Sequence, residues 1–298
     1  MNKLKKVVVR ILYRSCSILF PNIHVFSIED TMKEIIKNKV SVSRFGDGEF
    51  KWIYGIFQNS FQDDNEQLGK KLKQVIQKPK KNCLICIPPI FDGINQFTSD
   101  AAFFWKKHYI KYFNQWAKLL NTKVKYYNAN ITRPYMEYKD KSKSKKIFNY
   151  WKEIFNNRNL LIVEGVYTRF GVGNDFLRNA ASVNRIICPS NNAFQKIDTI
   201  EKKIKEEYKK IENPLVLVAL GPTATIIAYD LCDKGMQIID IGHADIEYEW
   251  FLKKARTKIS IKNKFVNEAG DNVNDFGIIQ DPIYNSEIVC VIKQESEK

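Results

Sequence analysis

Two carboxylates separated by a single glycine follow an apolar segment near the amino end of the chain. Residues 43–50 read Ser-Arg-Phe-Gly-Asp-Gly-Glu-Phe, so that one glycine stands between Asp47 and Glu49. Glycine permits a sharp backbone turn and carries no side chain that would obstruct an ion, so both carboxylates can converge on one hard cation. The neighbouring Arg44 offers paired donors that suit a phosphate. The alternative interpretation is a polar turn in which Asp47 caps a helix.

A glycine-rich segment with an arginine follows another apolar run. Residues 165–176 read Gly-Val-Tyr-Thr-Arg-Phe-Gly-Val-Gly-Asn-Asp-Phe and lead into a helix that we expect over residues 174–182. Backbone amides beside a glycine such as Gly173, just before a helix, can approach an anion, and Arg169 adds its charge, so the segment predicts a phosphate site. The third glycine of a dinucleotide fingerprint is missing, which argues against hydride transfer. Asp175 can equally be interpreted as a plain helix cap.

A third polar segment follows the apolar run 214–220. The chain turns there through Gly221 and Pro222 into an expected helix, and proline suits the first helical turn. Thr223 and Thr225 supply hydroxyls beside exposed amide donors, which predicts a second position for a phosphate or a ribose. Capping of the helix alone is the alternative.

The fourth polar segment brings a histidine and four acids together. Residues 238–250 read Ile-Ile-Asp-Ile-Gly-His-Ala-Asp-Ile-Glu-Tyr-Glu-Trp, in which His243 is one of only three histidines of the chain. If the chain is helical from residue 245 onward, Asp245 and Glu249 share one helix face. Such clustering couples pKa values and is typical of acid–base or metal chemistry. A structural histidine is the alternative, because a lone histidine is more often a buried hydrogen-bonding residue than a ligand.

Apolar, β-branched runs alternate with helical stretches along the chain, and this pattern predicts a mostly parallel sheet flanked by helices. The expected strands are 38–44, 82–87, 123–131, 159–164, 184–188, 214–220 and 236–241. The expected helices are 29–37, 65–78, 98–120, 143–156, 174–182, 193–211, 223–234 and 245–257. Ligands of open α/β sheets bind outside the carboxyl ends of the strands, and all four polar segments follow such ends. We therefore predict an α/β fold.

Length and composition narrow the class of protein. The chain has 298 residues, of which 44% are hydrophobic and only 13 are Gly and 9 Pro, which excludes collagen-like and broadly disordered proteins. No Gly/Ser/Pro-rich linker divides the chain, which favours a single domain. The six cysteines lie among apolar neighbours, which predicts a reducing, cytoplasmic environment. Cys83 and Cys86 form a C-x-x-C inside an apolar strand without a second ligand pair, so we interpret them as core thiols.

The chain is strongly basic. Its 48 Lys and Arg against 33 Asp and Glu give a formal net charge of +15. Such a charge suits nucleic acid, because neutralising phosphates releases counterions. The lysines are spread along the chain, however, and we find no zinc finger, basic zipper or aromatic–basic RNA signature, so we expect no specific nucleic-acid partner. Non-enzymatic nucleic-acid binding and an inactive scaffold role are the alternatives to an enzyme.

Residues 1–20 combine cations with apolar side chains. Arg10 and Arg14 interrupt the apolar stretch and no small-residue cleavage site follows, so we do not expect a signal peptide. No stretch of the chain approaches the roughly 20 apolar residues needed to span a bilayer. One interpretation is an amphipathic helix that binds the inner face of the membrane peripherally, with side chains such as Ile11 and Ile18 inserted. The other is a first helix packed on the domain with a solvated basic face.

Five segments in this order together resemble the GT-D glycosyltransferases, a family first described as a domain of unknown function, with members that glycosylate streptococcal adhesins. The segments are Arg-Phe-Gly-Asp-Gly-Glu-Phe (44–50), Gly-Val-Gly-Asn-Asp (171–175), Arg-Ile-Ile-Cys-Pro (185–189), Gly-Pro-Thr-Ala-Thr (221–225) and the acidic segment 240–250. The resemblance runs from about residue 40 to residue 268. It divides the chain into a basic helical segment (1–38), a GT-D-like domain (39–270) and a C-terminal extension (271–298).

The resemblance implies a Rossmann-like α/β fold and the transfer of a hexose from a nucleotide-sugar donor, a UDP-sugar, to a glycan, glycoprotein or lipid-linked acceptor in cell-surface polysaccharide synthesis or adhesin glycosylation. It also implies that the Asp-x-Glu motif, here Asp47 and Glu49, serves a divalent Mn²⁺ or Mg²⁺ and the nucleotide diphosphate. By their place in the loops we assign further residues to the nucleotide: Arg44, Gly46, Arg169, Gly173, Asn174, Asp175, Gly221 and Thr223.

Activation of an acceptor hydroxyl needs a base close to it, unless the transfer retains the anomeric configuration. A positioned carboxylate can contribute roughly 10²–10⁴-fold in rate. Asp245 and Glu249 are the candidates for this base, with His243 as an orienting group or further metal ligand.

Overall fold

The computed structural model describes residues 3–56, 58, 62–63, 65–272, 276–277 and 279–294, and for residues 3–6 the helical backbone alone. The described residues form one sheet of eight strands in the order β3-β2-β1-β7-β6-β4-β5-β8, and all neighbouring strands are parallel. The strands are β1 (Ser41–Arg44), β2 (Cys83–Ile87), β3 (Tyr127–Asn128), β4 (Asn159–Gly165), β5 (Ser182–Cys188), β6 (Pro214–Ala219), β7 (Ile238–Asp240) and β8 (Ile288–Val291). The predicted α/β class with a parallel sheet in one domain is confirmed.

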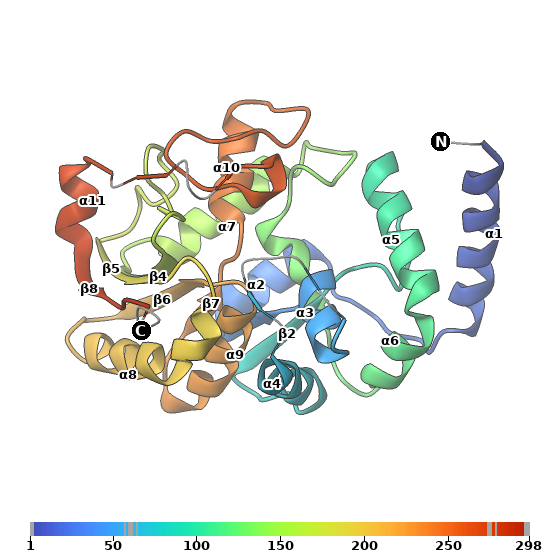
Figure 1. The fold of residues 1–298 in the computed structure, drawn as a ribbon, viewed down its shortest axis with the longest axis horizontal. Helices are drawn as coiled ribbons and strands as arrows, with labels where there is room; N and C mark the ends of the chain where they lie inside the picture. Colours follow the sequence, from blue (N-terminus) through green and yellow to red (C-terminus); the bar gives the residue numbers. More distant parts are fainter. Residues whose placement is uncertain are drawn as a thin grey trace.

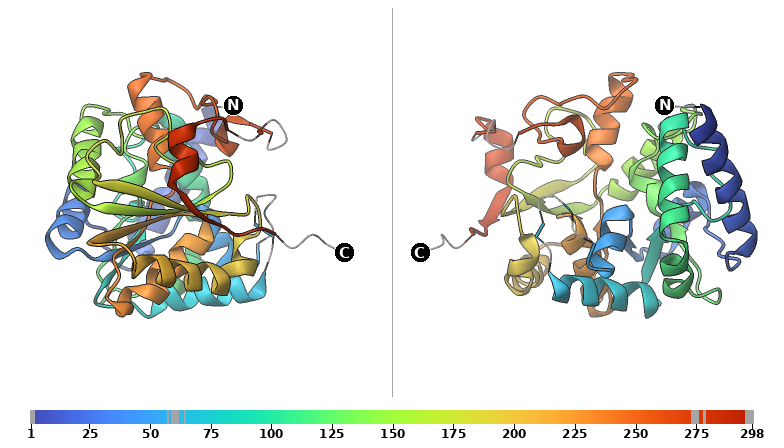
Figure 2. Two further views of the ribbon diagram at one scale, coloured as in Figure 1. Left: turned by 90° about the vertical axis from the view of Figure 1, so that its left-hand side faces the viewer. Right: turned by 45° about the vertical axis from the view of Figure 1, so that its right-hand side comes forward.

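Helices cover both faces of this sheet, as Figures 1 and 2 show. They are α1 (Lys3–Leu19), α2 (Ile28–Asn38), α3 (Asp47–Ile53), α4 (Glu66–Gln77), α5 (Ser99–Lys111), α6 (Phe113–Leu119), α7 (Ser144–Phe155), α8 (Ile197–Tyr208), α9 (Pro222–Leu231), α10 (Ala244–Leu252) and α11 (Pro282–Glu287). Short 3-10 turns complete the described structure: η1 (Ala129–Thr132), η2 (Ala193–Lys196), η3 (Cys232–Lys234) and η4 (Asn267–Ala269).

The core consists of two layers, one on each face of the sheet. Side chains alternate between the faces along each strand, so that Val216 and Val218 of β6 pack on one face while Leu215 and Leu217 pack on the other. The first layer includes apolar residues of α4, α8 and α9, and the second includes those of α2, α7 and α10. The sheet is therefore buried on both faces, as parallel sheets require.

Most predicted elements are confirmed. The short helix α11 was not predicted, and there are three further differences in the sheet and helices. Each predicted strand coincides with an observed one, although β3 has only two residues. β8 was not predicted, because it is a short edge strand whose Val289 and Val291 are exposed. The helix expected over 98–120 is divided into α5 and α6, which meet at Tyr112.

The third difference is that the helix expected over residues 174–182 is wrong. Residues 171–179 form turns and bends, and β5 begins at Ser182. Oδ1 of Asn174 accepts a hydrogen bond from the N–H of Phe176 at 2.9 Å, and such local bonds compete with helix formation. The glycine-rich segment therefore lacks the helix N-terminus on which its phosphate site was predicted.

The cysteines take no part in a cross-link or metal site. All six are free, and Cys83 and Cys86 are buried in β2. Cys83 packs on one face of the sheet and Cys86 on the other. Thiols on opposite faces of a sheet cannot hold one ion, so the interpretation of this C-x-x-C as core thiols is confirmed.

The first helix lies at the edge of the molecule. Figures 1 and 2 show α1 alongside α5, far from α11 and β8 at the opposite edge. Tyr13 of α1 packs with Trp105 and Tyr109 of α5 in a separate small core. In the part of the chain that the structure describes, no helix has the length and apolar character needed to cross a bilayer.

Candidate functional site

The carboxyl ends of β1 and β7 lie side by side in the middle of the sheet. The two strands pair through Val42 and Ile239. From β1 the chain continues to β2 and β3 on one side, whereas from β7 it continues through α10 toward β8 at the other edge. Adjacent strands whose connections diverge in this way mark the position where open α/β sheets bind ligands. The first and fourth polar segments of the sequence begin here.

Arg44 links these two strands through its guanidinium. Its Nε donates to the carbonyl oxygen of Asp240 and its Nη2 to Oδ1 of the same residue, both at 2.9 Å. Burial raises the pKa of Asp240, and the charge of Arg44 opposes this rise. Thr225 of α9 donates to the carbonyl oxygen of Arg44 at 2.8 Å. Nη1 has a longer contact, 3.4 Å to the carbonyl oxygen of Ala129, so it is the donor best able to turn to a phosphate.

Gly242 makes room for this guanidinium. Its φ is +46°, and a Cβ atom placed there would lie 1.8 Å from Nη2 of Arg44. A side chain would therefore strain the backbone and displace the guanidinium from Asp240.

Asp47 and Glu49 lie in the first turn of α3, directly after β1. The N–H of Gly46, the residue before the helix, donates to Oε2 of Glu49 at 2.8 Å. Oδ2 of Asp47 forms an ion pair with Nζ of Lys51 at 2.6 Å, one helical turn further on. Burial raises the pKa of Glu49, opposed by the hydrogen bond from Gly46. A helix does begin at this segment, but its N-cap is Gly46 and the capping carboxylate is that of Glu49, so the alternative in which Asp47 caps the helix is wrong.

A divalent ion at the start of α3 would have to bring ligands of its own. Among the described residues, no group of three or more His, Cys, Asp or Glu side chains could hold a metal ion. Mg²⁺ in nucleotide sites is usually held by one or two carboxylates together with substrate phosphates, so two hard oxygen donors suffice. The contacts named above engage one oxygen of each carboxylate, and a bound ion would compete with Lys51 for Asp47.

Gly221 and Thr223 lie at the start of α9, close to Thr225. Gly221 has φ +55°, and Pro222 is the first helical residue, as predicted. Thr223 is fully buried, and its Oγ1 has no hydrogen-bond partner in the described part of the chain. A hydroxyl without exposed surface can contact a phosphate or ribose only after a local movement. The predicted ligand position at Thr223 is therefore covered in this structure.

Arg169 is held by backbone oxygens of the C-terminal part of the chain. It is buried, and its guanidinium donates to the carbonyl oxygen of Asn263 at 2.7 Å and to that of Gly277. Its φ is +50°, and Gly173 nearby in sequence has φ +78°. Both donors thus serve the local fold, which does not favour the predicted contact of Arg169 with a nucleotide.

Asn174 and Asp175 bind neighbouring helices. The amide of Asn174 donates to Oδ1 of Asp245 at 2.8 Å and to Oε1 of Glu249 at 2.7 Å. Asp175 pairs with Lys152 at 2.8 Å and accepts a hydrogen bond from Tyr248 at 2.6 Å, and these two bonds lower its pKa. Asp175 is not the helix cap that was the alternative, because no helix follows it. The segment is anchored to α7 and α10 and does not form an open phosphate cradle.

Asp245 and Glu249 share one face of α10, as predicted, but a buried lysine occupies that face. Nζ of Lys264 lies 2.6 Å from Oδ2 of Asp245 and 3.4 Å from Oε1 of Glu249. Lys264 and Asp245 are almost completely buried. A carboxylate that is held by an ammonium and an amide is a poor acceptor for a substrate proton. The structure therefore does not favour Asp245 or Glu249 as the acceptor base and gives them a stabilising role. Nothing in the sequence pattern had indicated Lys264.

His243 and Glu247 are one turn apart on α10 and have unused hydrogen-bonding atoms. Nδ1 of His243 and Oε1 of Glu247 are buried and have no partner among the described residues. Oε2 of Glu247 accepts hydrogen bonds from the N–H groups of Tyr135 and Met136, both at 2.9 Å. We did not single out Glu247 from the sequence. Its spacing of four residues from His243 was the available signal, because such residues share a helix face.

Arg133 and Glu268 complete the surroundings of these two residues. They form an ion pair at 2.5 Å. Burial lowers the pKa of His243 to about 4, and the charge of Arg133 lowers it further. Burial raises the pKa of Glu247 to about 7, which Arg133 opposes. At intermediate pH the structure thus holds His243 neutral and favours the protonated form of Glu247.

These opposite shifts predict a compensating dependence of stability on pH. The histidine contribution is present above pH 6.5 and is lost as the pH falls toward about 4, because the unfolded state binds the proton more tightly. The Glu247 contribution is present below pH 4.5 and is lost as the pH rises toward about 7. As the pH rises from about 4 to about 7, the free energy of unfolding of Glu247→Gln should increase by about 3 kcal/mol relative to the wild type, because the Glu247 loss is removed. That of His243→Asn should decrease by a similar amount relative to the wild type, because the histidine gain is removed. Urea unfolding of the three proteins measures this, and parallel pH profiles would contradict it.

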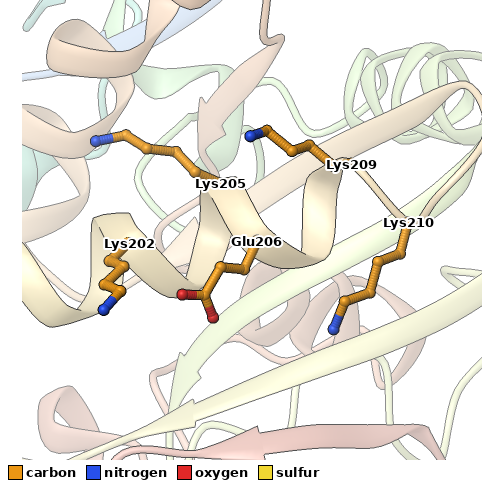
Figure 3. A pocket seen from close by; sticks show the side chains of 5 residues that line it. All are labelled: Lys202, Lys205, Glu206, Lys209 and Lys210. Carbon is orange, nitrogen blue, oxygen red and sulfur yellow. The ribbon is translucent and has the colours of Figure 1, made fainter.

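A surface hollow of about 640 Å³ lies elsewhere, on α8. Figure 3 shows the side chains that line it: Lys202, Lys205, Glu206, Lys209 and Lys210. Several are engaged in ion pairs with acids of the same helix or just beyond it, such as Lys205 with Glu201. They come from one exposed helix region and not from the carboxyl ends of strands, so we place the functional site at β1 and β7.

A family model described as the glycosyltransferase GT-D fold matches residues 42–269. Two solved structures of the domain of unknown function 1792 are similar along nearly the whole chain. One, described as having a distinct glycosyltransferase fold, has a TM-score of 0.87 and 36% identity and covers 96% of this chain and 100% of its own. The other, described as a new glycosyltransferase from Streptococcus sanguinis, has a TM-score of 0.85 and 32% identity, with coverages of 91% and 100%.

Two curated proteins are also similar in sequence. Glycosyltransferase GlyD of Streptococcus pneumoniae is 39% identical over 271 residues, which are 91% of this chain and 33% of that protein. The probable glycosyl transferase Gly of Streptococcus gordonii is 35% identical over 274 residues, which are 92% of this chain and 39% of that protein. The chain thus spans only between a third and two fifths of the length of these relatives.

Proposed function

This chain belongs to the GT-D glycosyltransferase family, and from that premise we propose that it transfers a hexose from a UDP-sugar to a glycan, glycoprotein or lipid-linked acceptor. The observation that carries the proposal is the meeting of Arg44, Asp240 and Glu49 at the carboxyl ends of β1 and β7, with Asp47 in the same turn of α3. A guanidinium and two carboxylates at that point suit a diphosphate together with its divalent ion. The names of the relatives support glycosyl transfer, and the chemistry of the site supports a diphosphate. The uridine nucleotide, the hexose and the acceptor are inferred from the family resemblance.

Asp47 and Glu49 would hold the divalent ion, Mn²⁺ or Mg²⁺. When bound, such an ion stabilises the negative charge that develops on the departing diphosphate, by several kcal/mol. Arg44 would donate to a phosphate oxygen while Asp240 keeps its guanidinium oriented. Residues at the ends of β1 and β7 and in the first turn of α3 would thus hold the leaving group together.

Acceptor activation, where the reaction requires a base, falls to the first turn of α10. Glu247 has an unused carboxylate oxygen and a pKa of about 7, close to the value that suits a general base at neutral pH. Access to this oxygen would require a local opening, because Glu247 has no exposed surface. His243, one turn earlier, would orient the acceptor hydroxyl.

A thermal-shift experiment tests the donor part of this proposal. We expect UDP with Mn²⁺ to stabilise the folded protein by about 2–3 kcal/mol at a concentration about 100 times its dissociation constant. A chelator should remove most of this effect, and duplex DNA, as a polyanion control, should not reproduce it. If no nucleoside diphosphate stabilises the protein and its DNA binding depends steeply on salt, the result would favour the non-enzymatic alternative. An unchanged shift in chelator would contradict the metal.

A further inference from the structure

The helix α1 is apolar on two faces, and the described structure covers only one of them. Its inner face packs on α5, where the rings of Tyr13 and Tyr109 meet at 5.4 Å between centroids. The hydroxyl of Tyr13 donates to the carbonyl oxygen of Ile90 at 3.3 Å, which fixes the rotation of the helix. A helix normally buries its apolar side chains against another element. The outer face of α1 therefore lacks the covering that its composition requires.

The outer face consists of large aliphatic side chains at helical spacing. Ile11 and Ile18 are 58% and 83% exposed, respectively. The full set on this face is Val7, Val8, Ile11, Leu12, Ile18 and Leu19, all of them exposed. The steps of four and seven residues between 7, 11 and 18, and between 8, 12 and 19, align them along one side of the helix. α1 lies at the edge of the molecule, so this side faces outward (Figures 1 and 2).

Cations flank this face, and α1 itself carries no carboxylate. The first acidic residue of the chain is Glu29, so all of α1 is free of acids. Arg10 and Arg14 of α1 are exposed. Burial lowers the pKa of Lys106 on α5, and the positive charges of Arg10, Lys139 and Arg14 lower it further. Like charges gathered in this way repel one another in the free protein, and an anionic partner would relieve that repulsion.

We propose that the outer face of α1 docks on an anionic lipid bilayer, with Ile11 and Ile18 inserted at the level of the headgroups and Arg10 and Arg14 against lipid phosphates. An aliphatic face bordered by basic residues is the composition of interfacial helices. Each cation near an anionic leaflet adds about 1 kcal/mol to binding. A second copy of this chain would place equal charges against each other at the same face, which is why we favour lipid. This contact would hold the glycosyltransferase beside membrane-bound acceptors.

Vesicle sedimentation of the full chain, without donor or acceptor, tests the proposal. We expect binding to vesicles with about 30% phosphatidylglycerol, weaker binding at high salt, and little binding to pure phosphatidylcholine. The double variant Ile11→Glu/Ile18→Glu should bind the anionic vesicles at least about tenfold more weakly than the wild type. Arg10→Gln/Arg14→Gln should weaken binding by a similar factor. Both pairs of side chains are exposed, so neither variant should disturb the core.

The control is Ile283→Glu on α11, because Ile283 is 73% exposed at the opposite edge of the molecule. It should bind vesicles as the wild type does. Wild-type protein that ignores anionic vesicles would overturn the proposal, as would equal binding by the Ile11/Ile18 variant. Sedimentation equilibrium that shows a dimer lost in this variant, without vesicle binding, would also overturn it and identify a second copy as the partner. Because no nucleotide enters these assays, their failure is distinct from a failure of the donor proposal.

Discussion

Replacing either acid of α3 should abolish metal-dependent turnover in a protein that stays folded. For Asp47→Asn and Glu49→Gln we expect the release of nucleotide diphosphate to fall by about 10³-fold or more, because a metal supplies several kcal/mol of transition-state stabilisation. The amide oxygen of Glu49→Gln can still accept the hydrogen bond from Gly46, so the start of α3 should survive. Thermal shift with Mn²⁺ and UDP should show the loss of binding directly.

Glu66 provides the matched control for this experiment. It lies in the first turn of α4 and pairs with Lys70 four residues on at 2.6 Å, the same arrangement as Asp47 with Lys51. Glu66→Gln should leave turnover and stability unchanged, since exposed pairs of this kind contribute little. Wild-type rates from both α3 variants would refute the metal site, and equal losses in the Glu66 variant would point to a general effect of charge.

The fold was predictable because its strands are buried on both faces. In β2 and β6 successive residues pack on opposite layers of the core, so both strands read as continuous apolar runs. Prediction failed for elements with little buried surface. β8 is a half-exposed edge strand, and the turns at 171–179 depend on side-chain hydrogen bonds of Asn174 that the hydrophobic periodicity does not indicate. Local pattern thus identified elements with a large buried surface and missed those held by single hydrogen bonds.

The site was predictable only in part, for a similar reason. The polar segments at strand ends were correctly located, because topology brings the carboxyl ends of parallel strands to one edge. The partners within them depend on contacts between distant parts of the chain. Arg44 and Asp240 are 196 residues apart, and Lys264 meets Asp245 from a loop without any motif. Residue type and spacing could suggest that Asp245 is catalytic, but only the packed structure shows that its carboxylate pairs with the ammonium of Lys264.

Removing that charge should be the most destabilising single change at α10. Lys264→Met leaves Asp245 and Glu249 buried without their ammonium, and breaking such a buried pair costs about 3–5 kcal/mol. The double variant Asp245→Asn/Lys264→Met should recover part of this loss, because only one carboxylate is then left without its buried partner. Urea unfolding measures the free energy of unfolding of the wild type and of these two variants. Lys203→Met, which breaks an exposed pair with Glu206 at 2.6 Å, is the control and should leave the free energy of unfolding nearly unchanged.

Turnover and unfolding of the single variant Asp245→Asn separate a stabilising carboxylate from a catalytic one. If Asp245 stabilises the fold, as its contacts with Lys264 and Asn174 indicate, Asp245→Asn should lower stability and keep its acceptor-dependent release of nucleotide diphosphate within about threefold of the wild type. A base would show the reverse, with a loss of about 10²–10⁴-fold and unchanged unfolding. That second pattern, with donor affinity intact, would restore Asp245 as the acceptor base and would mean that Lys264 leaves it during the reaction.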